Sequence, residues 1–122
     1  MDVRLKRAYD EPDPSDGARV LVDRVWPRGR SRDALRLAAW ERDIAPSTEL
    51  RRWFGHDPAR WAEFRSRYEA ELREPDRQAA MGRLAGLAAA GRLTLVFGAA
   101  DAERNQAVAI RDALLRRGRE TA

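Results

Sequence analysis

The sequence predicts a small α/β domain with a short, mostly parallel sheet flanked by helices. Residues 19–25 and residues 93–97 are largely apolar and stop at Pro27 and Gly98, as buried strands of parallel sheets do. Segments with helical periodicity separate these two runs along the chain. Because a strand–helix–strand connection favours parallel pairing, we expect the two runs to lie side by side.

Length and composition fit one folded domain with a strongly charged surface. The 122 residues are enough for one hydrophobic core, so residues 1–122 are taken as a single domain. Apolar residues make up 43% of the chain, which favours a folded protein over a disordered one. Cysteine, a signal peptide and a long apolar run are all absent, so we expect a cytoplasmic protein with neither disulfides nor a membrane partner.

The basic character of the chain suggests nucleic-acid binding, but its composition weakens that interpretation. The net charge is +4, and clustered cations bind phosphate backbones by releasing counterions. However, 23 of the 24 basic residues are arginine and 22 residues are alanine, a pairing that G+C-rich coding produces. Solvated arginine faces are therefore favoured over a dedicated nucleic-acid surface.

The first third of the chain contains two predicted strands and an acidic loop. Residues 3–6 alternate apolar and basic side chains, which is the pattern of an edge strand with one solvent-exposed face. Residues 10–17 contain two prolines and a glycine, which interrupt regular structure. Residues 19–25 follow as a central strand. Residues 35–44 favour neither a helix nor a strand.

Four segments have helical periodicity, each bounded by capping or breaking residues. Ser47 is placed to cap the first helix and Gly55 to end it. An Asp-Pro pair opens the second helix, a Glu-Pro pair stops it, and a glycine follows the third. The expected helices cover residues 47–54, 57–73, 76–90 and 102–117.

A binding site is expected beyond the carboxyl ends of the two central strands, where ligands bind in open α/β sheets. Residues 23–28 and residues 98–105 follow these strands, so parallel pairing places both segments at one end of the sheet. Arg24 and Arg28 carry planar guanidinium groups that bind phosphate or carboxylate in a bidentate manner.

Each polar residue near this end also has a structural interpretation. For Asp23 and Arg24, an internal ion pair or a brace of the loop is weighed equally with a ligand role, because a buried charge needs a partner in either case. Helix capping is favoured for Ser47 and is an alternative for Asp101. His56 is the only histidine, and bracing of a turn is favoured over acid–base catalysis.

Several well-defined sites find no support in the sequence. No G-x-S-x-G elbow accompanies Ser47 and His56, so a catalytic triad is not favoured. One histidine and scattered carboxylates make no recognisable metal-ligand spacing, and neither a Walker loop nor a dinucleotide glycine fingerprint occurs. We therefore expect no metal and no cofactor. Trp26 remains a candidate for stacking on a ligand, whereas Trp53 and Trp61 are expected in the core.

Three segments carry a family resemblance: residues 21–29 (LVDRVWPRG), 45–51 (APSTELR) and 53–58 (WFGHDP). They resemble the YeaO-like family, a bacterial domain of unknown function, and the likeness covers nearly the whole chain. It implies a compact α/β protein without an established activity.

Two positions depart from the family pattern. Phe97 stands where a tyrosine usually ends the strand, and Arg104 stands where a histidine commonly precedes Asn105. If that histidine took part in chemistry, this chain would lack it. Arg104 instead adds positive charge at the expected start of the last helix, which is compatible with anion binding.

The sequence thus predicts binding of a small anionic ligand that bears phosphate or carboxylate, with hydrolysis or group transfer as an enzymatic version. The residues expected to act as base, acid or orienting group are Asp23, Asp101 and His56. Those expected to bind the ligand are Arg24, Trp26, Arg28, Ser47, Arg104 and Asn105. The alternative is a nucleic-acid-binding or regulatory module that uses the arginine-rich residues 28–36. A third is an interaction protein whose arginines are merely surface.

Overall fold

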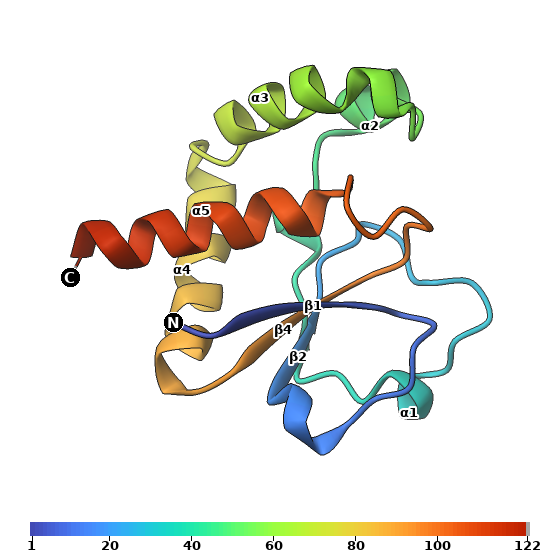
Figure 1. Cartoon of the computed structure of the whole chain (residues 1–122), viewed down its shortest axis with the longest axis vertical. Helices are drawn as coiled ribbons and strands as arrows, with labels where there is room; N and C mark the ends of the chain where they lie inside the picture. Colours follow the sequence, from blue (N-terminus) through green and yellow to red (C-terminus); the bar gives the residue numbers. More distant parts are fainter. Residues whose placement is uncertain (122) are drawn as a thin grey trace.

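The two apolar runs of the sequence form neighbouring parallel strands, as predicted. The computed structural model describes residues 1–121, and Ala122, the last residue of the predicted domain, lies outside this range. One four-stranded sheet has the order β1-β4-β2-β3, and all its pairings are parallel (Figure 1). The predicted edge strand is confirmed as β1. The strands are β1 (Val3–Arg7), β2 (Ala18–Leu21), β3 (Ala39–Trp40) and β4 (Leu93–Phe97).

Alternation along the strands divides the core between the two faces of the sheet. Val20, Leu95 and Phe97 point to the face that the long helices cover. Leu21 and Val96 point to the opposite face, where they meet a smaller apolar cluster contributed by the connection between β2 and β3. Both faces are therefore covered, which explains why the central strands are almost wholly apolar.

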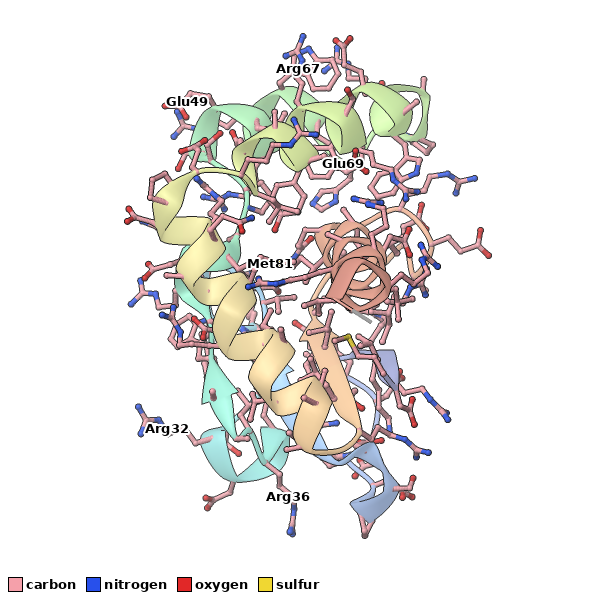
Figure 2. All side chains as sticks on the ribbon, turned by 90° about the vertical axis from the view of Figure 1, so that its left-hand side faces the viewer. Arg32, Arg36, Glu49, Arg67, Glu69 and Met81 are labelled. Atoms are coloured by element: carbon pink, nitrogen blue, oxygen red, sulfur yellow. The ribbon has the colours of Figure 1, made fainter. Side chains whose placement is uncertain are left out.

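The helices are unevenly distributed around the sheet. α2 and α3 lie at one end of the molecule and the short α1 lies at the other (Figure 1), while Met81 of α4 points toward α5 (Figure 2). No helix within residues 1–121 has the length and apolar character needed to cross a bilayer. The α-helices are α1 (Arg32–Leu35), α2 (Thr48–Phe54), α3 (Trp61–Glu71), α4 (Pro75–Ala90) and α5 (Gln106–Thr121), and short 3-10 turns occur at Pro14–Asp16, Arg42–Ile44 and Pro58–Arg60.

The start and stop signals of the first two helices are confirmed. The Ser47 hydroxyl accepts a hydrogen bond from the Leu50 N–H, and Gly55 ends α2 in the left-handed region with φ 52°. The Asp57 carboxylate accepts a bond from the Ala59 N–H and begins the turn that leads into α3. Local hydrogen bonds of this kind are readable from sequence because both partners lie within one helical turn.

β2 is shorter than the predicted strand, which extended to residue 25. The Val22 N–H still donates to the Val96 carbonyl at 3.0 Å, but the chain then leaves the sheet. The neighbouring strand β3 has only two residues and ends at Trp40, so β2 has no strand beside it on that side beyond this point. Instead, the indole N–H of Trp40 donates to the Asp23 carbonyl at 2.7 Å. Residues 23–27 therefore form a loop.

The last helix begins at Gln106, four residues later than predicted. The Asn105 side-chain oxygen accepts hydrogen bonds from the N–H groups of Ala107 and Val108 and so caps α5. Asp101 instead caps a separate turn by accepting from the Glu103 and Arg104 N–H groups. Both residue types are strong N-caps, so the sequence did not show which of the two starts the helix.

A buried ionic cluster holds the opposite, amino end of the sheet. The Asp16 carboxylate accepts hydrogen bonds from the Arg19 guanidinium at 2.7 Å and from the Lys6 ammonium at 3.2 Å. Burial acts to raise the pKa of Asp16, but the Asp13 N–H, Arg19 and Lys6 outweigh it, so the pKa is lowered. The chain turns sharply at Gly17, which has φ 68° and whose position leaves no room for a Cβ beside the Arg92 carbonyl.

Substitution of Gly17 by alanine should be strongly destabilising. An added Cβ would lie 2.2 Å from the Arg92 carbonyl oxygen in a backbone conformation that L-residues disfavour. We expect a loss of at least about 2 kcal/mol in the free energy of unfolding, measured by urea denaturation. Gly86→Ala is the control, since the space around Gly86 on α4 is open. It should gain about 0.5 to 1 kcal/mol, and equal effects of the two variants would contradict this account.

Candidate functional site

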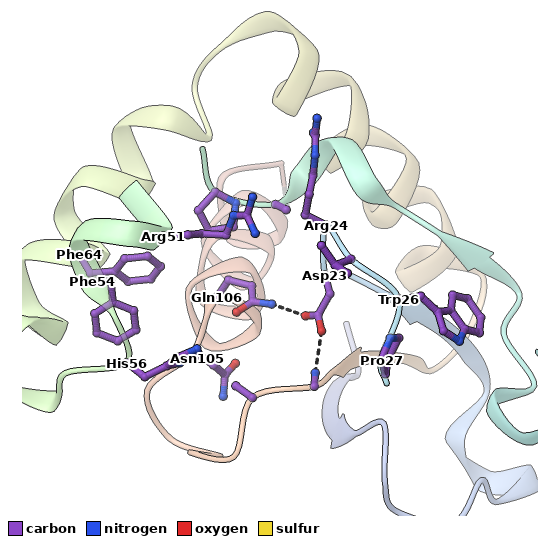
Figure 3. Close-up of a pocket in the computed structure, with 15 residues that line it drawn as sticks. Asp23, Arg24, Trp26, Pro27, Arg51, Phe54, His56, Phe64, Asn105 and Gln106 are labelled. Carbon is purple, nitrogen blue, oxygen red and sulfur yellow. Dashed lines mark hydrogen bonds between the residues drawn. The ribbon is translucent and has the colours of Figure 1, made fainter. Parts of the chain in front are cut away.

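A pocket lies at the carboxyl ends of β2 and β4, where the sequence predicted a site. Its volume is about 330 Å³, and 15 residues line it (Figure 3). The lining comes from three parts of the chain that are distant in sequence: the loop after β2, the region of α2 and α3, and the segment between β4 and α5. The predicted juxtaposition of residues 23–28 with residues 98–105 is therefore largely observed.

The Asp23 carboxylate joins two walls of this pocket. One oxygen, Oδ2, accepts a hydrogen bond from the Gly98 N–H at 2.8 Å, and the other, Oδ1, accepts from the side-chain amide of Gln106 (Figure 3). A Cβ on residue 98 would lie 2.9 Å from Asp23 Oδ2, so glycine is what allows this close approach. Asp23 thus connects the exit of β2, the exit of β4 and the start of α5.

The pKa of the Asp23 carboxyl is raised by its surroundings. Burial raises the pKa of this carboxyl above its ordinary value, because the charged form loses solvation. The hydrogen bonds from Gly98 and Gln106, together with the positive charges of Arg51 and His56, oppose the shift without reversing it. Of the two structural alternatives, no ion pair within residues 1–121 joins Asp23 to Arg24, whereas the bonds of Asp23 to Gly98 and Gln106 make it a brace of the loop.

Two arginines bring positive charge to the pocket from different elements. Arg51 lies on α2, and its Nη2 donates to the Thr48 hydroxyl at 3.2 Å. Its Nε is shielded from water and has no hydrogen-bond partner among the described residues. Arg24 follows the exit of β2, is exposed, and extends outward at the rim (Figure 3). His56 also lines the pocket and has a positive φ of 56°.

Apolar side chains make up most of the remaining wall. Phe54 and Phe64 stack with their ring centroids 4.3 Å apart on the α2 and α3 side. Trp26 lines the other side, where its indole N–H donates to the Arg30 carbonyl and its ring meets Trp40 edge-on at 5.3 Å. Trp26 is therefore held by its own partners and presents a fixed apolar surface.

Five of the nine predicted site residues line the pocket, namely Asp23, Arg24, Trp26, His56 and Asn105. Asn105 is 2% exposed; its amide nitrogen donates to the Asp101 carbonyl, and its side-chain oxygen accepts from the first N–H groups of α5. These bonds give Asn105 a structural role in the pocket wall.

The other four predicted residues, Arg28, Ser47, Asp101 and Arg104, lie outside the pocket lining. The Ser47 hydroxyl donates to Glu71 at 2.6 Å and caps α2, so the structural interpretation of Ser47 is confirmed. Arg104 pairs with Asp101 at 3.2 Å. The hydrogen bonds that Asp101 accepts from the N–H groups of Glu103 and Arg104 lower its pKa, so it stays ionised and is a poor proton donor.

The predicted arginine-rich stretch lies apart from the pocket. Arg32 and Arg36 project at the end of the molecule opposite α2 and α3 (Figure 2), and the Ala38 N–H donates to the Arg19 carbonyl near the amino end of β2. The Nε of Arg30 donates to the Ala8 carbonyl at 3.0 Å and is thus used within the fold. Nucleic-acid binding by residues 28–36 stays a prediction.

Comparison with known proteins places this geometry in a family. The model of a family described as the inactive DUF488-N3 subclade matches residues 2–122. The chain belongs to this family. It is 41% identical over 112 residues to the uncharacterized protein YeaO of Escherichia coli, an alignment that covers 92% of the chain and 96% of that protein. An uncharacterized protein of Mycobacterium tuberculosis is 49% identical over 84 residues, or 69% of the chain and 71% of that protein. No solved structure matches the chain.

The YeaO-like resemblance is confirmed by these matches, and the structure shows where the two departures from the family pattern lie. Phe97 is buried in the core of the helical face, where it needs no hydroxyl partner. Arg104 is outside the pocket lining, so its side chain is not one of the groups that a pocket ligand would meet.

Two pocket residues of this family member were missed in the sequence. Arg51 closes the segment 45–51 that carries the resemblance and lies one helical turn after the cap Ser47, a position that gives no local sign of a pocket. Gln106 follows the expected site segment directly. Their convergence on Asp23 depends on how α2 and α5 pack, which no local pattern reports. Within residues 1–121, no three carboxylate or imidazole groups are close enough to hold a metal ion.

The stability of Asp23→Asn relative to the parent protein should increase with pH. A carboxyl whose pKa is raised by folding contributes fully to stability at pH values below its unfolded pKa. This contribution is lost as the pH rises through the folded pKa. Asparagine keeps an acceptor for the Gly98 N–H and cannot ionise. The difference in melting temperature should therefore move in favour of Asp23→Asn between about pH 3 and pH 8.

Asp101→Asn is the matched control for this experiment, because the pKa of Asp101 is lowered. Ionised Asp101 stabilises the fold above its unfolded pKa, and this contribution is lost as pH falls through the folded pKa. The control should lose melting temperature relative to the parent protein over the same rise in pH. The same trend for both variants would show that burial does not govern Asp23.

Proposed function

We propose that the chain binds a small anionic ligand, bearing phosphate or carboxylate, in the pocket at the carboxyl ends of β2 and β4. The observation that carries this proposal is the state of Arg51. Its guanidinium lines the pocket, yet its Nε is buried and has no acceptor among the described residues. The one hydrogen bond that the guanidinium donates to a described residue runs from Nη2 to the Thr48 hydroxyl, so an anion in the pocket would meet donors that no protein acceptor occupies.

The charge balance of the pocket supports an anion. Arg24 and Arg51 contribute two cations against the single carboxylate of Asp23. Both oxygens of that carboxylate already accept hydrogen bonds from Gly98 and Gln106, so donors of the protein partly compensate its charge and weaken its repulsion of an anion. Asn105 and Gln106 also bring the amino-terminal, positive end of the α5 dipole to the pocket.

Binding without turnover is better supported than hydrolysis or group transfer. Ser47 is engaged with Glu71 and lies outside the pocket lining, while the Asp23 oxygens are occupied by the protein's own donors. A nucleophile positioned beside a base is therefore absent among the described pocket residues. The description of the matched subclade as inactive agrees with this. A cytoplasmic location stays a prediction from the cysteine-free sequence.

Removal of the Arg51 charge should reduce the stabilisation that a ligand provides. A thermal-shift panel of phosphate, acetate, citrate, benzoate and phenyl phosphate should include ligands that raise the melting temperature by roughly 10 °C at about 100 times their Kd. Arg51→Gln should weaken that binding by about tenfold or more, because a hydrogen bond to a charged group is lost. Arg52→Gln is the control, since Arg52 is the exposed neighbour outside the lining.

Equal effects of the two substitutions, or no stabilisation by any anion, would contradict the proposal. The nucleic-acid alternative is tested by titrating the parent protein with DNA and RNA at low salt. Arg32→Gln combined with Arg36→Gln should leave anion binding unchanged, because both side chains lie at the far end of the molecule (Figure 2). Salt-dependent nucleic-acid binding that this double variant weakens would instead support the alternative.

A further inference from the structure

The pocket is much larger than a single inorganic anion. Its volume is about 330 Å³, which is space for about ten water molecules at roughly 30 Å³ each. Pockets for small organic molecules begin at about 300 Å³. A phosphate or carboxylate group held by Arg51 would therefore occupy only part of the space. The remaining volume fits the rest of a small organic molecule that carries this group.

The walls around that remaining space are apolar and partly aromatic. Phe54 and Phe64 form one side, and Pro27 and Pro46 close others. Val25 stands at the rim with 67% of its surface exposed, an unusual position for a large aliphatic side chain. Flat, rigid surfaces of this kind are stabilised by contact with an apolar ring, because burial removes apolar area from water.

Gln106 adds a directional polar group between the apolar walls. Its amide nitrogen donates to the Asp23 carboxylate, which settles which end of the amide is the nitrogen. The amide oxygen consequently points away from Asp23 (Figure 3), and none of the described residues donates a hydrogen bond to it. Asp23 therefore holds Gln106 so that an acceptor faces the pocket.

We infer that the pocket selects an aromatic anion: a phosphate or carboxylate on a ring that also carries an O–H or N–H donor. Arg51 binds the anionic group, the apolar walls contact the ring, and Gln106 Oε1 accepts from the donor. This inference rests on the proposed function and names its ligand class. Gln106 is then the residue that determines specificity, and Asp23 is the residue that positions it.

Calorimetric titration with matched probes tests each part. Acetate and inorganic phosphate present the anion alone, benzoate and phenyl phosphate add the ring, and the three hydroxybenzoates add a donor at different positions. We expect the ring to tighten binding by at least about tenfold over the bare anion. The best hydroxybenzoate should bind at least about fivefold more tightly than benzoate.

Two variants separate the contributions. Gln106→Met should remove the preference for the hydroxybenzoate over benzoate. The preference is the ratio of the two dissociation constants, so a general disturbance of the pocket, which weakens both ligands alike, would leave it unchanged. Val25→Ala, on an exposed side chain that the core does not need, should weaken benzoate and leave acetate unchanged. The tighter of benzoate and phenyl phosphate identifies the anionic group.

The outcomes distinguish this inference from the function on which it rests. If acetate or phosphate binds in an Arg51-dependent manner and the ring adds nothing, the aromatic ligand class is wrong while anion binding stands. A hydroxybenzoate preference that survives in Gln106→Met would overturn the role of Gln106. If no probe binds and Arg51→Gln changes nothing, both proposals fail.

Discussion

The hydrogen bonds of one partly buried carboxylate connect the segments at the carboxyl end of the sheet. Asp23 leaves β2, accepts from the backbone of Gly98 after β4, and accepts from Gln106 at the start of α5. These three points are far apart in the chain, and the missing side chain of Gly98 lets them meet. The pocket between them exists because Asp23 sets their separation and orientation.

Desolvation of the Asp23 carboxylate costs free energy, and the charges around it affect which ligands the pocket would accept. Burial raises its pKa, and the hydrogen bonds from Gly98 and Gln106, with the charges of Arg51 and His56, oppose the shift without reversing it. No ion pair joins Arg51 to Asp23 among the described residues, and the Nε of Arg51 has no hydrogen-bond partner there. An arginine that is not paired with Asp23 is what the proposed anion binding requires, and the family's description as inactive agrees with binding without turnover.

Much of the polar sequence that resembled a functional site is structural. Ser47 links the start of α2 to Glu71 of α3, and Asn105 caps α5. At the opposite end, Asp16 and Arg19 form a buried pair beneath the turn at Gly17. Strand ends and helix starts expose unpaired backbone groups, so the same residue types that bind ligands occur there as caps and braces. Residue type and position in a motif do not separate the two roles.

The sequence by itself determined three of the four strands, the parallel pairing of β2 and β4, the edge position of β1 and the two ends of α2. These features depend on alternation and on hydrogen bonds within one turn, such as Ser47 to Leu50. Tertiary structure alone decided that β2 ends at Leu21, that Asn105 and not Asp101 starts α5, and that Arg51 and Gln106 join Asp23. Each of these depends on partners distant in the chain, as the bond from Trp40 to the Asp23 carbonyl illustrates. A local sequence pattern carries no information about which distant residue will lie beside a given side chain in the folded protein.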